Sequence, residues 1–234
     1  FPGGKVAVDD LSLETYSGEI FAMLGHNGAG KTTAINCIVG LTRPTAGEST
    51  INGFDVRTDL DMARQQISVC PQDNPVYEEF TVLQHLAFFG SLRGVPRGHI
   101  EQRVGTILAA LGMSDKSDDP CGKLSGGQKR RLWVATALIG NSPITFLDEP
   151  TSGMDPSSRR ELWDLLLRIR DTGRCIIFTT HYLEEADILA SRKAVLARGR
   201  VQAMGTSQEL KTKFGSGYRL LLEMPAAGGD AQQL

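Results

Sequence analysis

The chain has 234 residues, of which 41% are hydrophobic and 22% are charged. This composition is that of a globular protein with one large domain or two small ones, and it excludes collagen-like, coiled-coil and disordered chains. Lys and Arg total 25 against 27 Asp and Glu, a formal net charge of −2. Because a nucleic-acid binder normally carries a basic excess, we expect no nucleic-acid partner.

The apolar segments are short, and none approaches the roughly 20 consecutive apolar residues that cross a bilayer. The cysteines are far apart and form no C-x-x-C pair, so the sequence indicates neither a zinc site nor a disulfide framework, and a reducing compartment suits it best. They are Cys37, Cys70, Cys121 and Cys175. The chain starts at Phe1 without an initiator Met or a secretory signal. We interpret it as a piece of a longer polypeptide.

Strand and helix patterns alternate along most of the chain. The sequence predicts strands at 20–24, 144–147 and 175–180, each with a helix after it, at 31–40, 157–171 and 183–189. This alternation is typical of an α/β fold with a largely parallel sheet.

Other segments depart from the alternation. Residues 6–13, 49–51 and a hairpin of 193–197 with 200–204 look antiparallel, whereas 81–111 reads as two helices with no strand between them. We therefore expect a parallel core with a small antiparallel β lobe and an inserted helical lobe at about 78–142. The domain would span 1–224, and the small and polar residues 225–234 would form a flexible tail or linker.

A phosphate-binding pattern follows the first predicted strand and opens a helix. The segment Gly25, His26, Asn27, Gly28, Ala29, Gly30, Lys31, Thr32 matches G-x-x-x-x-G-K-[ST]. Its glycines let successive backbone N–H groups point at one centre, and the helix adds its positive dipole end. Lys31 would bridge the β- and γ-phosphates of a nucleotide, Thr32 would bind Mg²⁺ and Thr33 would meet a phosphate nearer the sugar.

Two alternatives to a phosphate loop of this kind are weaker. A Gly-rich turn with a surface Lys could open a helix, but it does not account for strand, loop and helix together. The glycines also stand in the order G-x-x-G-x-G, which speaks against a dinucleotide-binding fingerprint.

Two carboxylates end the predicted strand at 144–147. Adjacent strand residues point to opposite faces, so Asp148 and Glu149 are expected to have different tasks. Asp148 would hold Mg²⁺ through its water shell, and Glu149 would polarise an attacking water. The alternative is an acidic turn that caps the next helix.

A histidine follows the strand at 175–180. His181 would emerge at the carboxyl edge of a parallel sheet, where ligands bind. A neutral imidazole there could donate to a γ-phosphate oxygen. A structural His next to a helix start is an equally open interpretation.

The segment 124–128, Leu-Ser-Gly-Gly-Gln, precedes an apolar-periodic helix. Ser125 and Gln128 have the spacing of a capping box, which leaves Gly126 and Gly127 unexplained. Two glycines indicate close approach to an anionic group, and one nucleotide hardly needs a second phosphate site in one chain. We therefore expect this segment to complete the site of another copy in a head-to-tail pair. The basic residues 129–131 are interpreted as a solvated helix face.

Taken in order, these motifs resemble the ATP-binding domain of an ATP-binding cassette (ABC) transporter, a P-loop NTPase. The set consists of Gly25 to Thr33, Gln72, Leu124 to Gln128, Asp148 with Glu149, residues 152–155, and His181. Segment 124–128 is the discriminating element. Residues 25–33, 69–74, 180–187 and 214–218 further resemble the A subfamily of eukaryotes, whose members are mostly lipid exporters.

The resemblance implies roles for individual residues. Gln72 would reach the Mg²⁺ and the attacking water, and Ser125, Gly127 and Gln128 would contact ATP held by the opposite domain. Asp155 would sit in a loop that crosses the dimer interface, with helix capping as the simpler alternative. An aromatic ring ahead of the phosphate loop stacks on adenine in this family, and Phe1 is the candidate.

The resemblance also implies an activity and partners. The chain would bind ATP and Mg²⁺, pair with a second ABC ATP-binding domain of the same or a paralogous chain, and drive transmembrane domains from the cytoplasmic face of a membrane. A soluble regulatory or ribosome-associated ABC ATPase is the alternative. DNA-repair ATPases place long coiled coils between the phosphate loop and the segment that corresponds to 124–128. In this chain only the stretch from 72 to 124 separates the motifs. A GTPase is disfavoured because 52–55 lacks the Lys of Asn-Lys-x-Asp.

Overall fold

The structure is a computed structural model that describes residues 6–215. Phe1 and the tail 225–234 therefore lie outside the described residues. The main sheet has six strands in the order β4-β5-β6-β1-β7-β8. All neighbouring pairs are parallel except β7 with β8, which are antiparallel. The bounds are β1 Ile20–Leu24, β4 Ile67–Cys70, β5 Ile144–Asp148, β6 Cys175–Thr180, β7 Arg192–Ala197 and β8 Arg200–Gly205.

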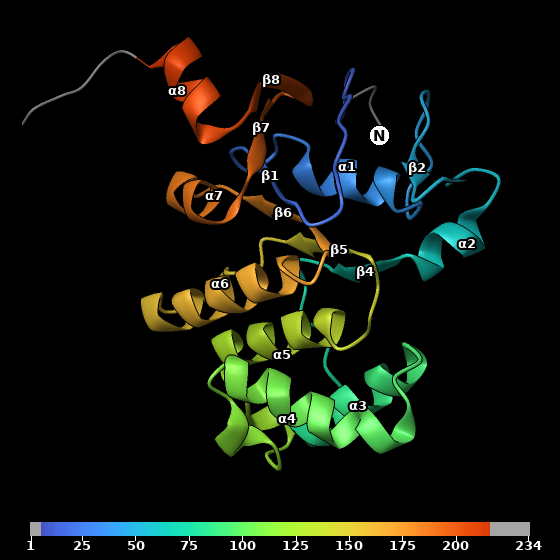
Figure 1. Cartoon of the computed structure of the whole chain (residues 1–234), viewed down its shortest axis with the longest axis vertical. Coiled ribbons are helices and arrows are strands. Elements are labelled where there is room, and N and C mark those ends of the chain that lie inside the picture. Colours follow the sequence, from blue (N-terminus) through green and yellow to red (C-terminus); the bar gives the residue numbers. More distant parts are fainter. Residues whose placement is uncertain (1–5, 216–234) are drawn as a thin grey trace, which may run out of the picture.

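Helices cover both faces of this sheet (Figure 1). Successive residues of β1 point to opposite faces, so Ile20 and Ala22 belong to one core and Phe21 and Met23 to the other. The first core includes residues of α5 and α6, and the second includes residues of α1. All six residues of β6 are buried, as expected for a central strand of a parallel sheet.

The predicted strand and helix pairs are confirmed. The helices are α1 Lys31–Ile38, α6 Pro156–Arg170 and α7 Leu183–Leu189, which follow β1, β5 and β6. Strands β1 and β6 and helix α7 have the expected bounds, whereas α1 ends two residues earlier than expected. The parallel α/β core is thus the one that the sequence predicts.

The antiparallel part differs from the expectation. The hairpin of β7 and β8 is present, but it extends the main sheet because β7 pairs in parallel with β1. Residues 6–13 form no strand; instead the Asp9 N–H donates to the Gly199 carbonyl (2.8 Å), which holds the segment against the hairpin turn. The small antiparallel sheet consists of β2 Thr50–Ile51 and β3 Phe54–Asp55.

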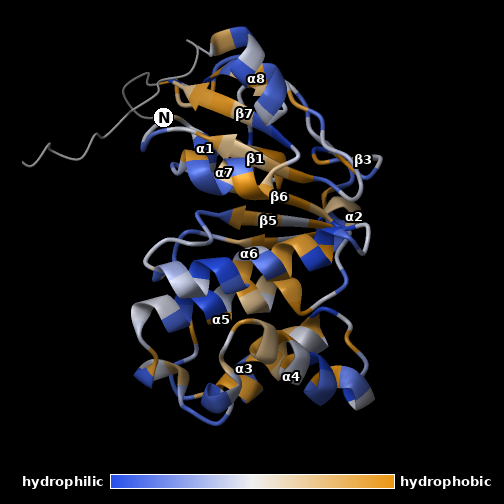
Figure 2. Cartoon of the chain, turned by 60° about the vertical axis from the view of Figure 1, so that its left-hand side comes forward, coloured by the Kyte–Doolittle hydropathy of each residue, from blue (hydrophilic) through white to orange (hydrophobic). Residues whose placement is uncertain are grey.

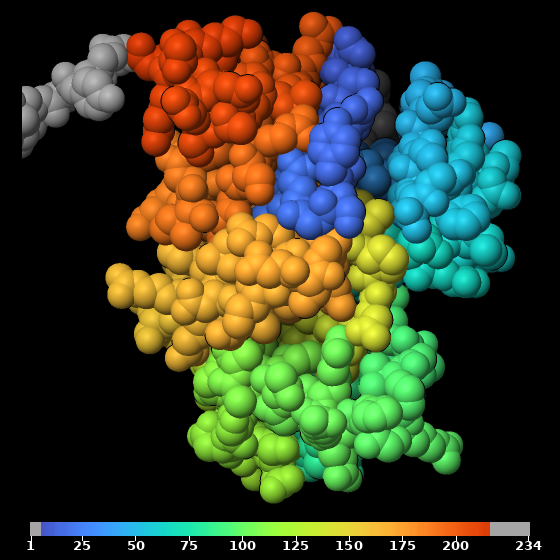
Figure 3. Space-filling view, in the orientation of Figure 1, coloured from blue at the N-terminus to red at the C-terminus, as the bar shows by residue number. Residues whose placement is uncertain are grey.

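The helical part contains the two helices expected between 81 and 111. They are α3 Val82–Leu92 and α4 Ile100–Ala110, and α5 Gly126–Leu138 packs between them and the sheet. Three single 3₁₀ turns connect them, η1 Arg97–His99, η2 Ser114–Lys116 and η3 Cys121–Lys123. In the space-filling view these helices form the end of the molecule opposite to α8 (Figure 3).

Four strands and helices were not predicted: strands β3 and β4, helix α2 Leu60–Gln65 and helix α8 Ser207–Phe214. The hydropathy colouring shows apolar strands and mixed helix surfaces (Figure 2). None of the helices in the described part of the chain combines the length and the apolar character that a bilayer crossing requires.

Candidate functional site

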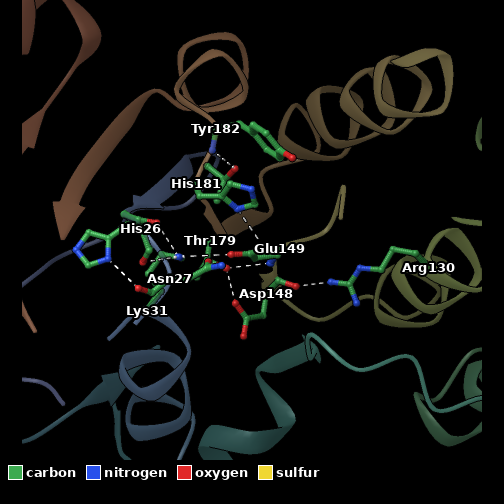
Figure 4. Close-up of polar contacts among 11 residues, drawn as sticks. His26, Asn27, Lys31, Arg130, Asp148, Glu149, Thr179, His181 and Tyr182 are labelled. Atoms are coloured by element: carbon green, nitrogen blue, oxygen red, sulfur yellow. Dashed lines mark hydrogen bonds and ion pairs between the residues drawn. The ribbon is translucent and has the colours of Figure 1, made fainter. Parts of the chain in front are cut away.

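The predicted site residues follow three neighbouring parallel strands. The register pairs Leu24 of β1 with Thr180 of β6, and Asp148 of β5 with Thr179. The carboxyl ends of β1, β5 and β6 therefore share one edge of the sheet, where ligands bind in open α/β folds. The phosphate loop, the two carboxylates and His181 all leave the sheet at this edge (Figure 4).

The phosphate loop bends at glycines that adopt left-handed backbone conformations. Gly28 has φ 79° and Gly30 has φ 102°, and the Ala29 N–H donates to the His26 carbonyl (3.1 Å). A Cβ on Gly30 would lie 2.4 Å from the Ala7 carbonyl oxygen, so a larger residue would displace main chain. Residues 26–28 are exposed, and α1 begins directly after Gly30 with no side-chain cap. The loop thus presents main chain at an uncapped helix N-terminus, which suits an anion.

Lys31 lies beneath the loop and is only 5% exposed. Its Nζ donates to the carbonyl oxygens of Gly25 (2.7 Å) and His26 (3.3 Å), and it lies 3.4 Å from Glu149 Oε1. A buried ammonium needs such partners because burial of a charge is costly. Lys31 is therefore placed between the loop and the carboxylate that follows β5.

Glu149 contacts both Lys31 and His181 at this edge of the sheet. Its Oε2 lies 3.2 Å from His181 Nδ1, and its N–H donates to Thr179 Oγ1 (2.9 Å). The residue is 9% exposed and has φ 49°. Strand β5 ends at Asp148, so the alternation of strand side chains, from which we expected opposite directions for Asp148 and Glu149, does not extend to Glu149. A left-handed turn directs this side chain to Lys31 and His181.

The Asp148 side chain points away from Lys31 and His181 (Figure 4). It is 3% exposed, and its Oδ1 accepts a hydrogen bond from the Thr179 hydroxyl. Among the described residues, Oδ2 has no hydrogen-bond donor. The Asp148 carboxylate and the Thr32 hydroxyl, which belongs to the first turn of α1, supply hard oxygen donors, the type that holds Mg²⁺ in proteins that also bind phosphates. Asp148 and Thr32 therefore fit a magnesium ion.

Thr179 is a site residue that the sequence analysis missed. Its hydroxyl donates to Asp148 Oδ1 and accepts a hydrogen bond from the Glu149 N–H, so Thr179 helps to position both acids. The two threonines at the end of the buried strand β6 were the available signal, because a buried hydroxyl needs a partner.

His181 lies at the same edge, and its side chain is 36% exposed. Its ring packs at a tilt of 38° against the Tyr182 ring, with 4.1 Å between the centroids, and the Tyr182 N–H donates to Thr180 Oγ1 (3.0 Å). Because Nδ1 faces Glu149, Nε2 is the nitrogen available to a ligand. The contact with Glu149 favours the functional interpretation over the structural one.

The segment Ser125–Gln128, called the signature segment from here on, lies apart from the cluster of Lys31, Glu149 and His181. Ser125 Oγ accepts from the Gln128 N–H (3.3 Å), and Gln128 Oε1 accepts from the Ser125 N–H (2.9 Å). The expected capping box is therefore present, and α5 begins at Gly126. Ser125 and Gly126 are exposed. In the described part of the chain, no residue of the segment forms a hydrogen bond with Lys31, Glu149 or His181.

Gln72 and Asp155 occupy loops that border α5, the helix that begins in the signature segment. Gln72 is exposed directly after β4, and its side chain forms no hydrogen bond to a described residue. Asp155 accepts from the N–H groups of Ser157 and Ser158 (both 3.0 Å) and caps α6. The Ser158 hydroxyl and these N–H groups lower the pKa of Asp155. The capping interpretation of Asp155 is thus confirmed, and its role at an interface stays a prediction.

The basic segment 129–131 corrects another expectation. Arg130 is 1% exposed, so the segment is not a solvated face. Its guanidinium bonds to loops at the sheet edge rather than to solvent. Arg130 precedes Val134 by four residues and Leu138 by eight, on the buried stripe of α5. That spacing was the signal in the sequence.

Known proteins match both the sequence and the fold. The family model described as ABC transporter matches residues 8–152. The chain belongs to the ABC transporter family. It is 45% identical to ABC transporter A family member 6 of Dictyostelium discoideum over 93% of this chain. The retinal-specific phospholipid-transporting ATPase ABCA4 of Mus musculus is 44% identical over 94% of the chain. The human phospholipid-transporting ATPase ABCA3 is 43% identical over 93% of it.

This ABC domain is a small part of such relatives, because it spans 13%, 10% and 13% of their respective lengths. Solved structures share its fold. The ATP binding subunit of an ABC transporter has a TM-score of 0.82 and 29% identity, covering 89% of this chain and 87% of its own. A dimeric ATP-binding cassette in a post-hydrolysis state, bound to ADP and Pi, has a TM-score of 0.78 and 25% identity, covering 86% and 90%. The domain is thus an ABC ATPase with a P-loop NTPase fold.

Proposed function

We propose that this domain binds MgATP, pairs head-to-tail with a second ABC ATP-binding domain and hydrolyses ATP at the closed interface. The observation that carries the proposal is the position of Glu149, which lies between Lys31 and His181 at the carboxyl edge of the sheet. The proposed base is thereby in contact with both a cation that would bind phosphate and a histidine that would donate a hydrogen bond. The dimer with ADP and Pi among the structural neighbours supports the pairing.

ATP would bind with its phosphates over the loop 25–30. The main-chain N–H groups and the N-terminus of α1 attract the anion, and Lys31 exchanges its carbonyl partners for the β- and γ-phosphates. Thr33 would contact a phosphate nearer the sugar. Phe1, the proposed adenine-stacking residue, lies outside the described residues.

Asp148, Thr32 and the side chain of Gln72 would hold magnesium next to the phosphates. When bound, the ion supplies positive charge that offsets the charge developing on the β- and γ-oxygens. Thr179 keeps Asp148 in position for this through its hydroxyl. Gln72 would enter from the exposed loop after β4.

Glu149 would act as the general base. The water oxygen forms a bond to the γ-phosphorus while the bond from phosphorus to the ADP oxygen breaks, and Glu149 accepts the proton of the water. Movement of Lys31 toward the phosphates frees Oε1 of Glu149 for that water, because this oxygen now faces Lys31. His181 keeps Nδ1 on Glu149 and donates from Nε2 to a γ-phosphate oxygen.

The second half of each site would come from the partner domain. Ser125, Gly126, Gly127 and Gln128 are exposed or half-buried at the N-terminus of α5, away from the Lys31 cluster of their own chain. They would bind the γ-phosphate and ribose of the partner's ATP. Asp155 would lie in the loop that crosses this interface.

ATP hydrolysis by the dimer would drive transport across a membrane. The relatives named as phospholipid-transporting ATPases support lipid as the transported class, driven through transmembrane domains with this domain at the cytoplasmic face of the membrane. A soluble regulatory or ribosome-associated ABC ATPase is the second candidate. Apolar spans on either side of this segment in the full polypeptide would decide between the two.

Replacement of the base tests the proposal. Glu149→Gln keeps the shape but cannot take the proton, so ATP binding should persist while turnover falls by about 10²–10⁴-fold. With MgATP the variant should elute as a dimer in light-scattering chromatography. Glu101→Gln, an exposed change on α4, is the matched control and should behave as the unchanged chain. Full turnover by Glu149→Gln, or a strictly monomeric complex with MgATP, would contradict the proposal.

A further inference from the structure

Arg130 is a fully charged side chain in the interior of the domain. It lies two residues after Gln128 in α5 and is 1% exposed. A guanidinium does not lose its proton in a protein, so its burial is tolerated only where acceptors satisfy its N–H groups. The position of those acceptors therefore indicates the task of the side chain.

The acceptors lie on two segments, the loop after β4 and the end of β5 with the residues that follow it. On the first, Nη1 donates to the carbonyl oxygens of Pro71 (2.7 Å) and Gln72 (3.2 Å) and to Asn74 Oδ1 (2.9 Å). On the second, Nε donates to the Pro150 carbonyl (3.3 Å) and Nη2 to the Asp148 carbonyl, a contact drawn in Figure 4.

Four of the five acceptors are main-chain carbonyls, and in the described residues no carboxylate forms an ion pair with Arg130. The hydrogen bonds of the guanidinium therefore depend on the position of the main chain next to Gln72 and Glu149. A planar fork with five donors can hold two loops at a fixed separation, whereas an ammonium on a flexible stem cannot.

We propose that Arg130 is a positioning residue that fixes α5 to segments 71–74 and 148–150 of its own chain, which carry Gln72, Asp148 and Glu149. The inference rests on the proposed function, in which Ser125–Gln128 meets the partner's ATP while Gln72, Asp148 and Glu149 serve the chain's own ATP. Closure of α5 on the partner's nucleotide then moves the main chain at Gln72 and Asp148 together with the helix. Arg130 links the two ATP sites of the dimer.

The adjacent arginine provides a matched control. Arg131 is also largely buried, with a side chain that is 14% exposed. Its Nη1 donates to the Leu111 carbonyl (2.9 Å) and lies 3.6 Å from Glu161 Oε2, so it joins α5 to α4 and α6. It has the same charge on the same helix turn, but within the described chain it forms no hydrogen bond or ion pair with residues 71–74 or 148–150.

The test is steady-state hydrolysis of MgATP by the whole chain with Arg130→Lys and, separately, Arg131→Lys. Lysine keeps the charge and the stem but reaches only one loop. We expect Arg130→Lys to lower kcat by about tenfold or more with KM for ATP within about twofold, because small displacements of catalytic groups are costly to the rate while the phosphate loop is untouched. Arg131→Lys should stay within about twofold in both constants.

An unchanged kcat in Arg130→Lys would overturn the inference, and so would an equal loss in both variants. If Arg130→Lys does not fold, Asn74→Ala decides, because it removes one side-chain acceptor and leaves Arg130 in place. A fall of about threefold in kcat at constant KM is expected there, with no change in the neighbouring variant Asp73→Ala. Absence of hydrolysis by the unmodified chain would instead count against the proposed function itself.

Discussion

The phosphate loop and the signature segment both place glycines at the start of a helix, but their polar side chains have different partners. At the phosphate loop the helix has no side-chain cap, and Lys31 bonds to the loop and to Glu149. At the signature, Ser125 and Gln128 cap α5 by themselves and remain near the surface. At the first helix start, Lys31 contacts Glu149 of its own chain, which in turn contacts His181. Among the described residues, the signature segment has no hydrogen bond to these three, which is why we assign it to the site of a partner domain.

The largest effect is expected from Lys31→Ala. This change removes the buried cation of the phosphate loop, so ATP affinity should fall by at least about 100-fold, which corresponds to roughly 3 kcal/mol. Titration with a fluorescent ATP analogue measures the loss. Lys211→Ala on the exposed helix α8 is the control. Retained affinity would show that the loop does not bind phosphate through Lys31.

A change in the signature segment should lower ATP hydrolysis far more than ATP affinity. A Cβ on Gly127 would lie 3.2 Å from the Gly153 carbonyl oxygen, and an aspartate there adds a negative charge where the proposed dimer would bind the partner's phosphates. Gly127→Asp should therefore leave ATP affinity within about threefold and lower hydrolysis by about 100-fold. The same fluorescent titration and a phosphate-release assay separate the two quantities. Equal losses in both would place the signature in the ATP site of its own chain.

A smaller effect concerns the stability of the helical part rather than the chemistry of the sheet edge. His85 on α3 is 0% exposed, and neither ring nitrogen has a hydrogen-bond partner in the described residues. It packs against Phe89 (4.9 Å between centroids) and Trp133 (5.9 Å). Burial lowers its pKa to about 4. Below pH 6.5 the unfolded chain therefore binds a proton that the folded chain does not.

The free energy of unfolding should consequently fall as the pH decreases from 6.5 toward 4, with a contribution from His85 of up to about 3 kcal/mol at the lower limit. His85→Phe keeps the aromatic contacts and removes the titration, so the loss between pH 7 and pH 4.5 should become smaller. Urea unfolding at the two pH values measures this. The exposed His99→Phe is the control, and an identical pH dependence in all three proteins would contradict the prediction.

Much of the fold could be predicted because the central strands are apolar runs with clear helix starts after them. Strand β6 and helix α7 have the bounds expected from the sequence. Strand β4 and helix α2 were missed because they are short, and because Ser68 interrupts the apolar run and bonds to Thr145 inside the sheet. Residues 6–13 alternate like a strand, but their described hydrogen bonding to the hairpin is limited to Asp9.

The site residues could be predicted from motifs, whereas their geometry could not. The ion pair of Lys31 with Glu149 depends on a left-handed turn after β5 that no local pattern indicates. Arg130 was misplaced because its charge was weighed more heavily than its position on the buried stripe of α5. Both features arise from contacts between segments far apart in the sequence, which a local pattern does not contain.

The most direct measurement of the two-half-site account is complementation between inactive variants. Glu149→Gln disables the base of one chain, and Gly127→Asp disables the signature of another. In a head-to-tail pair, one of the two sites combines the intact base of the second chain with the intact signature of the first. When Glu149→Gln is mixed without ATP with an excess of Gly127→Asp and MgATP is then added, hydrolysis should appear that neither variant shows alone. A mixture as inactive as its components would contradict the account.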